Sequence, residues 1–589
     1  MTSFNISKLR LLVSDREYKD CKFVDINNNV NQDYYDDIKI NSYERKLFNG
    51  DIIDINDHNK VTSVIRNSST VIAGVLVLKN NRSYGRTNNK KRLLYQCIPD
   101  DKHLPVFLLP YELKIGFNKC YTNKYVIFKF ESWINQHPTG LLHEVLGDVD
   151  NLDVFYEYQL YCRSLHYSLI NFTKKSRQVF NDKTTDEYID QIINNSNFHI
   201  KDYRNRYVFT IDPKNSTDFD DGFSIEPCIN GWRINIYISN VFLWLETLNL
   251  WKSFTKRVST IYLPDRKRPM LPTILSDTLC SLQENENRFA LTMEIIVNSD
   301  GTINEDVPIQ YNNVIINVAK NYNYDDNILT DDVHYKNLFN ISKKLSKTVK
   351  TDHDLVSFWM VYMNMSVGNK MNEAKHGIFR TAFIQNKELH TDIDTKLNDE
   401  TKRVIQTWNN AVGKYVAYKD DISLQHEMMK FHKSRHDNKN VNAYIHITSP
   451  IRRLVDLLNQ IQFFYSYSLV DHISHDANEF YKKWIDELEF INTSMRSIRK
   501  VQNECELLTK CINNKQLFNI TYTGVLFDKL KKNDGLYSYM VYLEEIKMLS
   551  RIIVVDNLDN YSSHKFKLFL FEDEDKLQRK IRVNLLINN

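Results

Sequence analysis

Alternating apolar and polar positions mark both ends of the chain as rich in β-strands. In the N-terminal part, short apolar runs separated by turns predict strands at Val71–Leu78, Val106–Leu109 and Tyr125–Phe130. Near the C-terminus, the same alternation predicts strands at Asn519–Phe527, Tyr537–Glu545 and Ser550–Val555. Short strands joined by polar turns are typical of small barrels of the OB or cold-shock type. We therefore expect a β-barrel domain toward each end.

The middle of the chain changes its periodicity. Residues 155–200 read as helical, and residues 205–300 return to strands around one strongly polar loop. Beyond residue 335 the pattern predicts helices at Tyr335–Thr348, His353–Ala374, Thr401–Lys419 and Ser423–Ser434, and further helical segments after Pro450 and from Trp484. The expected fold class is therefore α+β and multidomain, with barrels flanking a large α+β centre.

Composition and charge set limits on the class of protein. The 589 residues are 42% hydrophobic and 26% charged, which is typical of globular domains and excludes wholesale disorder. Lys and Arg total 77 and Asp and Glu total 74, so the net charge neither demands nor forbids a nucleic-acid partner. No apolar run approaches the roughly 20 residues needed to cross a bilayer. We therefore expect no membrane segment and a cytoplasmic location. The 8 cysteines lack the spacing of a metal site, and we expect them to be reduced thiols.

The polar loop carries a dense group of carboxylates. It follows the apolar segment Tyr207–Ile211 and contains Asp212, Asp218, Asp220 and Asp221. Like charges at this density cost free energy unless a cation neutralises them, and hard oxygen ligands favour Mg²⁺, Mn²⁺ or Ca²⁺ over zinc. An EF-hand is excluded, because position twelve counted from Asp218 is Ile229. The plain alternative is an acidic, solvated loop; the chemical one is a Mg²⁺ site for phosphoryl chemistry.

A basic segment far along the chain supplies a complementary charge. Thr448, Ser449 and Pro450 form a helix-start pattern, and Arg452 and Arg453 follow in what would be the first helical turns. Backbone N–H groups, the helix dipole and an arginine fork would then converge on one anion such as a phosphate. The alternative is a capped helix with surface arginines.

The acidic and basic segments are more than two hundred positions apart. We predict that they nevertheless fold into one pocket, with Asp220 close to Arg452.

Together these segments resemble the RNB family, the ribonuclease II and ribonuclease R type of 3′→5′ exoribonuclease. The family's Thr-Ile-Asp-Pro and Asp-x-Asp-Asp block is matched by the four aspartates, and its His-x-Thr-Ser-Pro-Ile-Arg-Arg block by His446–Arg453. A third match runs from Arg257 to Pro264, including Tyr262, and resumes at Pro269–Pro272, Leu275–Ser276 and Leu279–Leu282. A weaker match is formed by Asn492, Arg496 and Gln502. The flanking segments resemble the eukaryotic exosome-type branch of the family without its endonuclease domain.

The resemblance implies the fold plan and the roles of individual residues. Residues 1–60 would be a partial cold-shock-like domain, 61–155 a cold-shock-like OB domain, 156–515 the RNB catalytic domain and 516–589 a C-terminal OB domain. Mg²⁺, or Mn²⁺ in its place, would be held by Asp212, Asp218, Asp220 and Asp221, with Asp220 indispensable for cleavage. Arg452 would contact the scissile phosphate and Tyr262 would stack on the RNA. Further RNA contacts are expected from Arg257, His446, Thr448, Ser449, Arg453 and Gln502.

The activity implied by the resemblance is hydrolysis of single-stranded RNA from its 3′ end, with two metal ions, to nucleoside 5′-monophosphates. The partner would be single-stranded RNA and the protein a monomer, and association with an exosome-like complex is an open question.

Some positions depart from the family pattern: Asn240, Ala382, Leu454, Gln460 and Ile461. None of them is an expected metal ligand. They nevertheless keep open an alternative, a catalytically weak RNA-binding factor with the same fold. A structural protein with a Ca²⁺ loop is disfavoured, because the EF-hand pattern is missing.

Overall fold

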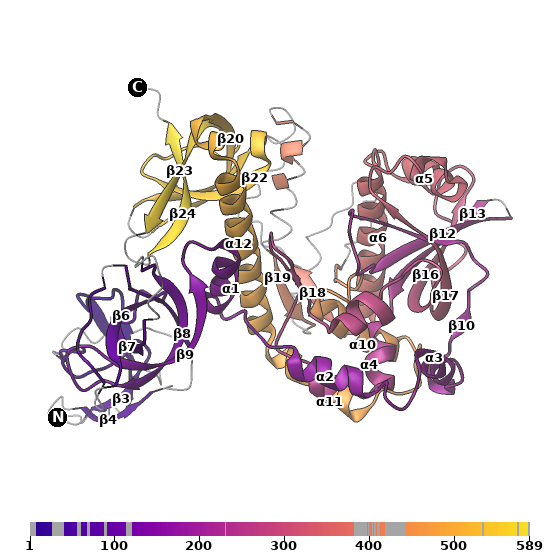
Figure 1. The fold of residues 1–589 in the computed structure, drawn as a ribbon. Coiled ribbons are helices and arrows are strands. Elements are labelled where there is room, and N and C mark those ends of the chain that lie inside the picture. Colours follow the sequence, from indigo (N-terminus) through magenta and orange to yellow (C-terminus); the bar gives the residue numbers. More distant parts are fainter. Residues whose placement is uncertain are drawn as a thin grey trace, which may run out of the picture. The chain divides into compact units, whose positions relative to one another are not determined.

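The computed structural model describes most of the chain as two compact units. It describes residues 8–25, 40–55, 61–66, 71–79, 81–87, 91–113, 121–229, 231–381, 397–398, 400–402, 404–405, 408, 413–418, 443–532, 535–573 and 577–586. The first unit combines Met1–His166, Leu263–Asp265 and Lys500–Asn589, and the second combines Tyr167–Tyr262 and Arg266–Arg499. Figure 1 shows the elements of both units.

The first unit begins with a small sheet and a closed barrel. The sheet has the order β2-β1-β3-β4, and the barrel the order β5-β6-β7-β9-β8. Strand β1 shows why the sequence folds this way, because Leu9, Leu11 and Val13 are buried while Arg10 and Leu12 are exposed. The bounds are β1 Leu9–Val13, β2 Cys21–Asp25, β3 Ile52–Ile55, β4 Val61–Ile65, β5 Ile72–Leu76, β6 Leu93–Pro99, β7 Phe107–Tyr111, β8 Lys124–Ser132 and β9 Thr139–Asp148.

Helix α1 (Leu152–Cys162) joins the separate chain segments of the first unit. It starts at Asn151, whose side chain accepts hydrogen bonds from two backbone N–H groups of the first turn. The Tyr158 ring stacks on Tyr125 of the barrel at 4.1 Å. Gln159 donates to Gln578 of β24 (Gln578–Leu586) at 2.9 Å. The barrel and the C-terminal sheet are therefore connected through one buried helix face.

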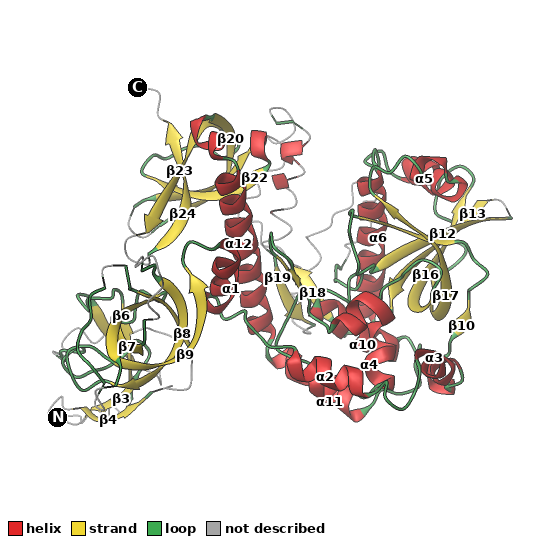
Figure 2. Cartoon of the chain, viewed as in Figure 1, coloured by secondary structure: helices red, strands yellow, loops and turns green. Residues whose placement is uncertain are grey.

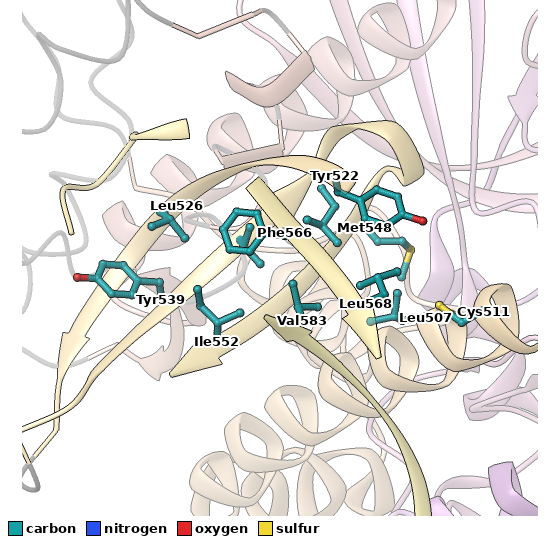
Figure 3. Close-up of a cluster of buried hydrophobic side chains, with 12 residues drawn as sticks. Leu507, Cys511, Tyr522, Leu526, Tyr539, Met548, Ile552, Phe566, Leu568 and Val583 are labelled. Carbon is teal, nitrogen blue, oxygen red and sulfur yellow. The ribbon is translucent and has the colours of Figure 1, made fainter. Parts of the chain in front are cut away.

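The C-terminal part of the first unit is a five-stranded sheet with the order β22-β21-β20-β23-β24. Its apolar core, drawn in Figure 3, includes Tyr522, Leu526, Tyr539, Phe566, Leu568 and Val583. Side chains alternate along β23, where Phe566 is fully buried and Phe569 is 42% exposed. The remaining bounds are β20 Thr521–Lys531, β21 Tyr537–Leu543, β22 Met548–Val554 and β23 Ser563–Asp573, with short 3₁₀ turns at Lys515–Asn519 and Glu544–Ile546.

The second unit is built on a six-stranded mixed sheet with the order β10-β17-β11-β12-β13-β16, in which β16 also pairs with β17. Figure 2 shows α4, α5, α6 and α10 around this sheet. The strands are β10 Lys201–Asp202, β11 Val208–Asp212, β12 Asp221–Cys228, β13 Gly231–Ser239, β16 Asn287–Asn298 and β17 Gln310–Asn323. Strand β11 runs parallel to β17 and antiparallel to β12. The loop that joins β11 to β12 therefore lies at the ends of two interior strands of the sheet.

The remaining elements of the second unit are mainly helical. The helices are α2 Ile170–Gln178, α3 Thr185–Ile193, α4 Val241–Thr247, α5 Val333–Leu345, α6 Asp352–Glu373, α10 Leu454–Ser466, α11 His475–Asp486 and α12 Leu488–Asn513, and the last of these continues into the first unit. A short hairpin pairs β14 Ile261–Tyr262 with β15 Lys267–Arg268. A second two-stranded antiparallel sheet pairs β18 Ile378–Thr381 with β19 Lys414–Ala417. Single turns of helix lie at Ser196–Phe198, Trp251–Ser253, Ile274–Leu279 and Leu329–Asp331.

The architecture confirms the α+β class with barrel-like sheets, and it corrects one helix. Residues 414–417 of the expected helix Thr401–Lys419 form strand β19 instead. The reason is tertiary: the Asn492 side chain accepts from the Tyr415 N–H at 2.8 Å and donates to its carbonyl at 2.9 Å, as a neighbouring strand would. The expected helix Ser423–Ser434 and residue Ala382 lie outside the described residues. The domain boundaries stay a prediction.

Two further expectations concern membranes and thiols. Among the helices that the structure describes, none combines the length and apolar character needed to span a bilayer. The cysteines in the described part of the chain are free thiols, and Cys505 and Cys511 are both buried in α12.

Phe566→Ala is expected to loosen the C-terminal sheet strongly, because it empties a fully buried ring position. The expected loss is about 3–5 kcal/mol of local stability. Phe569→Ala, on the exposed face of the same strand, should cost about 1 kcal/mol or less. Hydrogen exchange of peptides from β20 and β21 in the full chain measures both variants, and equal protection in the two would contradict the assigned core.

Candidate active site

The acidic loop is held between two strand ends. Strand β11 ends at Asp212 and β12 begins at Asp221, so these two aspartates lie at neighbouring strand ends of the sheet. Asn215 turns the chain with φ of +70°, in the left-handed region that Asn tolerates. Ser281 fixes the rest of the loop, because its hydroxyl accepts from the Phe219 N–H at 3.0 Å and donates to the Thr217 carbonyl at 2.8 Å.

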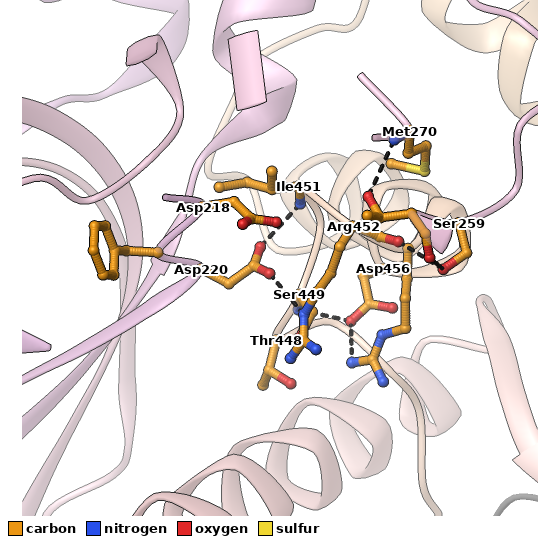
Figure 4. Close-up of polar contacts among 12 residues, drawn as sticks. Asp218, Asp220, Ser259, Met270, Thr448, Ser449, Ile451, Arg452 and Asp456 are labelled. Atoms are coloured by element: carbon orange, nitrogen blue, oxygen red, sulfur yellow. Dashed lines mark hydrogen bonds and ion pairs between the residues drawn. The ribbon is translucent and has the colours of Figure 1, made fainter. Parts of the chain in front are cut away.

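The acidic loop meets the basic segment at Asp220, as Figure 4 shows. One carboxylate oxygen of Asp220 accepts from the Ile451 N–H at 2.9 Å, and the other accepts from Arg452 Nε at 3.0 Å. The Asp220 side chain is 3% exposed, whereas the Arg452 side chain is 45% exposed. The predicted meeting of two distant segments is thus confirmed. Burial raises the pKa of Asp220 to about 7, although Arg452 and the Ile451 N–H oppose the rise.

The basic segment differs from the expected capped helix. Helix α10 begins at Leu454, and Arg453, not Ser449, is the residue before it. The cause is Asp456, whose buried carboxylate accepts from the Ser449 N–H and from Arg453 Nη2, both at 2.8 Å. This closes a turn ahead of the helix. Arg452 stays in that turn because its carbonyl accepts from the Ser259 hydroxyl and the Thr260 N–H. The helix dipole is therefore not the feature that positions Arg452.

Asp212 and Asp221 each have a carboxylate oxygen that no described residue satisfies. Oδ2 of each is buried and lacks a hydrogen-bond partner among the described residues. Burial raises the pKa of Asp221 to about 6, opposed by Arg452 and Arg453. Burial and then the charge of Asp221 raise the pKa of Asp212 well above its usual value. Two buried, unsatisfied carboxylate oxygens are a donor set that fits a hard divalent cation such as Mg²⁺ or Mn²⁺.

Asp218 is engaged by side chains of the β14–β15 hairpin. In that hairpin Tyr262 lies opposite Lys267, and both side chains reach Asp218. The Tyr262 hydroxyl donates to Asp218 Oδ2 at 3.2 Å, and Lys267 Nζ donates to Asp218 Oδ1 at 2.8 Å. Burial raises the pKa of Tyr262, and the charge of Asp218 raises it further, so this hydroxyl keeps its proton. Tyr262 as a residue is still 43% exposed, so it is accessible to a stacking partner.

Several residues expected to bind RNA have structural partners within the protein. Arg257 donates to the carbonyls of Tyr167 and Pro269 at 2.8 Å each. Nδ1 of His446 contacts the Tyr415 hydroxyl at 2.7 Å.

Thr448 and Ser449 are buried in the turn before α10, 2% and 3% exposed. Gln502 is partly buried on α12 in the first unit. Contact of any of these residues with RNA stays a prediction.

The positions that depart from the family pattern serve the core. Asn240 starts α4, accepting from the Leu243 N–H at 3.1 Å. Gln460 is fully buried and donates to the Ser239 carbonyl at 2.8 Å, and Leu454 and Ile461 are fully buried.

Sequence reasoning missed two residues beside the carboxylates. Lys267 follows no recognisable motif, and only the hairpin register brings it to Asp218. Tyr324 follows β17 in an Asn- and Asp-rich stretch without a pattern, and its N–H donates to the Asp212 carbonyl at 3.0 Å. Its ring stacks on His353 at 3.6 Å, and the pKa of Tyr324 is raised by burial and by the charges of Asp221 and Asp212.

Comparison with known proteins adds independent findings. The sequence pattern of the RNB domain family matches residues 200–331 and 327–468. Exoribonuclease 2 of Psychromonas ingrahamii is 42% identical over 96 residues, which are 16% of this chain and 15% of that protein. Ribonuclease R of Mycoplasmopsis pulmonis is 24% identical over 328 residues, which cover 46% of this chain and 45% of that protein. The matched segments thus span less than half the length of either relative.

Two solved structures share the fold. RNase R of Mycoplasma genitalium, in complex with ribose-methylated single-stranded RNA, matches 98% of this chain and 100% of its own with a TM-score of 0.64 and 15% identity. Yeast Ssd1, a pseudonuclease, matches 96% of this chain and 80% of its own with a TM-score of 0.55 and 13% identity. At these identities the likeness concerns the fold alone.

Mg²⁺ is expected to raise the melting temperature of the protein above its value in EDTA, because it binds the folded state at Asp212 and Asp221. Asp212→Asn should abolish most of this increase. In EDTA it should melt at or above the wild-type temperature, since one of two repelling carboxylates is gone. Asp182→Asn, at an exposed position of the same unit, is the control and should keep the full Mg²⁺ effect. A persistent Mg²⁺ effect in Asp212→Asn would exclude this pair as the metal site.

Proposed function

We propose that the chain, whose residues 200–331 and 327–468 match the RNB domain family as its motifs predicted, is a hydrolytic 3′→5′ exoribonuclease dependent on a divalent cation. Its substrate would be single-stranded RNA and its products nucleoside 5′-monophosphates. The observation that carries this proposal is the contact between buried Asp220 and half-exposed Arg452, beside the open carboxylate oxygens of Asp212 and Asp221. Carboxylates from one segment and a guanidinium from a distant segment would together bind a metal ion and a phosphodiester.

Arg452 is the residue suited to bind the reacting phosphate. Its Nε is held by Asp220 and its Nη2 donates to the Ser449 hydroxyl at 3.0 Å, so the guanidinium plane is fixed. With 45% of the side chain exposed, the remaining donors are open to a phosphate oxygen. A fixed cation of this kind stabilises the charge that develops on the phosphate during displacement.

A divalent ion would be held by Asp212 and Asp221. When bound, it would neutralise charge on the reacting phosphate. We expect Mg²⁺, with Mn²⁺ as a substitute, since carboxylate ligands favour both. The expectation of two ions rests on the family resemblance alone, and the open oxygens of Asp212 and Asp221 account for one ion.

Tyr262 would hold the RNA without reading its sequence. Its half-exposed ring can stack on a base, and stacking accepts every base. The hydrogen bond from its hydroxyl to Asp218 limits the directions in which the ring can face. The closed barrel and the C-terminal sheet are of the kind that binds single strands, and we propose that they bind the substrate too. A monomeric state and a cytoplasmic location stay predictions from the sequence.

A catalytically weak RNA-binding factor is the second candidate. It is favoured by the shared fold of a pseudonuclease and by the departures at Leu454, Gln460 and Ile461. These three side chains of α10 are fully buried, so they do not belong to an exposed RNA-binding surface. All four aspartates expected in a nuclease are present. We therefore favour the nuclease.

Asp220→Asn is expected to abolish RNA degradation while RNA binding persists, because the amide no longer pairs electrostatically with Arg452. The assay uses 5′-labelled single-stranded RNA with Mg²⁺, and wild type should leave one short end product. EDTA should stop the wild-type reaction. The control Asp182→Asn should degrade RNA as wild type does. Binding without degradation by wild type would support the second candidate, and degradation by Asp220→Asn would place the chemistry elsewhere.

Tyr262→Ala is expected to change the length of the final RNA fragment more than the rate of degradation, because the stacking ring is lost. Tyr262→Phe keeps the ring and removes only the hydroxyl bonded to Asp218, so it should leave the fragment length as in wild type. Denaturing electrophoresis of the end products measures both variants. The same fragment from Tyr262→Ala as from wild type would remove Tyr262 from the stacking role.

A further inference from the structure

The four aspartates of the site do not have equal freedom to bind a metal ion. Asp220 uses both carboxylate oxygens, one on the Ile451 N–H and one on Arg452. Asp218 also uses both, one on Lys267 and one on the Tyr262 hydroxyl. Of these four, only Asp212 and Asp221 keep a buried oxygen that has no partner among the described residues. The open oxygens therefore provide for one ion.

Lys267 occupies a position that a second cation would take. Its ammonium has three hydrogen-bond donors, and three oxygens surround it: Asp218 Oδ1 at 2.8 Å, Asp277 Oδ1 at 3.0 Å and Thr217 Oγ1 at 2.5 Å. Two carboxylates and a hydroxyl are the ligand types of a hard metal ion. Burial alone would lower the pKa of Lys267, but its bonds to Asp218 and Asp277 raise it, so the ammonium stays charged.

The arrangement around Lys267 is built into the fold. Lys267 lies opposite Tyr262 in the β14–β15 hairpin, and its side chain is 23% exposed. Asp277 also accepts from the Ser276 hydroxyl at 2.5 Å, and the loop around Thr217 is fixed by Ser281. These contacts tie the ammonium to the acidic loop on one side and to the turn of helix at Ile274–Leu279 on the other.

We propose that Lys267 is a built-in second cation of the site: it neutralises Asp218 and bridges it to Asp277, so that the pocket binds one divalent ion instead of two. This inference rests on the proposed function. Lys267 is a positioning residue, because it acts through Asp218 and, through the Asp218–Tyr262 bond, on the stacking ring. A covalently attached ammonium cannot dissociate, so this part of the site would stay assembled when divalent ions are scarce.

The test counts bound Mn²⁺ in the RNA-free full chain, by the loss of the free-Mn²⁺ electron paramagnetic resonance signal. Wild type should bind one ion that Asp212→Asn removes. Lys267→Met should bind a second ion, because Asp218 and Asp277 then face each other without a cation. Lys267→Met combined with Asp277→Asn should return to one. Lys320→Met is the matched control, since Lys320 pairs with Glu284 at 3.0 Å outside the site, and it should behave as wild type.

Comparison with Asp212→Asn separates the site from weak surface binding, for example at the exposed group His475, Asp476 and Glu479. Two site ions in wild type would overturn the inference without any variant being needed. An unchanged count in a folded Lys267→Met protein would also overturn it. Because no RNA is present, the result is independent of the assay above. A protein that degrades RNA and binds two ions refutes only the role of Lys267, and one that binds a single ion and leaves RNA intact refutes only the nuclease.

Discussion

The site depends on one ion pair, in which the half-exposed Arg452 binds the buried carboxylate of Asp220. A carboxylate that is 3% exposed is costly without partners, and here the Arg452 guanidinium and the Ile451 N–H compensate that cost. The same contact fixes the turn before α10 against the acidic loop, so the two halves of the site hold each other in place. Asp456 supports the turn from the other side by binding Ser449 and Arg453. Removing the Arg452 guanidinium would leave the buried Asp220 carboxylate with the Ile451 N–H but without a positive charge beside it.

Electrostatics divides the aspartates of the loop into two kinds. Asp218 and Asp220 face cations of the protein, Lys267 and Arg452. Asp212 and Asp221 face each other's charge and have open oxygens. The ion pairs of Asp218 and Asp220 hold the loop in one shape without a metal ion. The mutual repulsion and open oxygens of Asp212 and Asp221 favour binding of a cation. The charged groups of the site are therefore preorganised before RNA binds, as the positioning of a reacting phosphate requires.

The departures from the family pattern that lie among the described residues are explained by packing. Asn240 starts a helix, Gln460 binds the Ser239 carbonyl, and Leu454 and Ile461 lie in the core. Each sits beside the strand or helix that carries the site, and none removes a carboxylate or the guanidinium. This is the physical reason for regarding them as alternative ways of supporting the same elements.

The sequence by itself determined the β-rich ends, the mixed centre, the family and the residue types of the site, because these depend on local periodicity and short motifs. Val71–Leu78 and the four-aspartate loop could be read from neighbouring residues alone. Only the tertiary structure decided which partners those residues meet. It turned residues 414–417 into a strand through Asn492, moved the start of α10 to Leu454 through Asp456, and brought Lys267 to Asp218. The Asn492–Tyr415 and Lys267–Asp218 contacts join positions 77 and 49 residues apart. The Asp456 contacts are local, but they depend on a buried carboxylate that the helix-start pattern does not reveal.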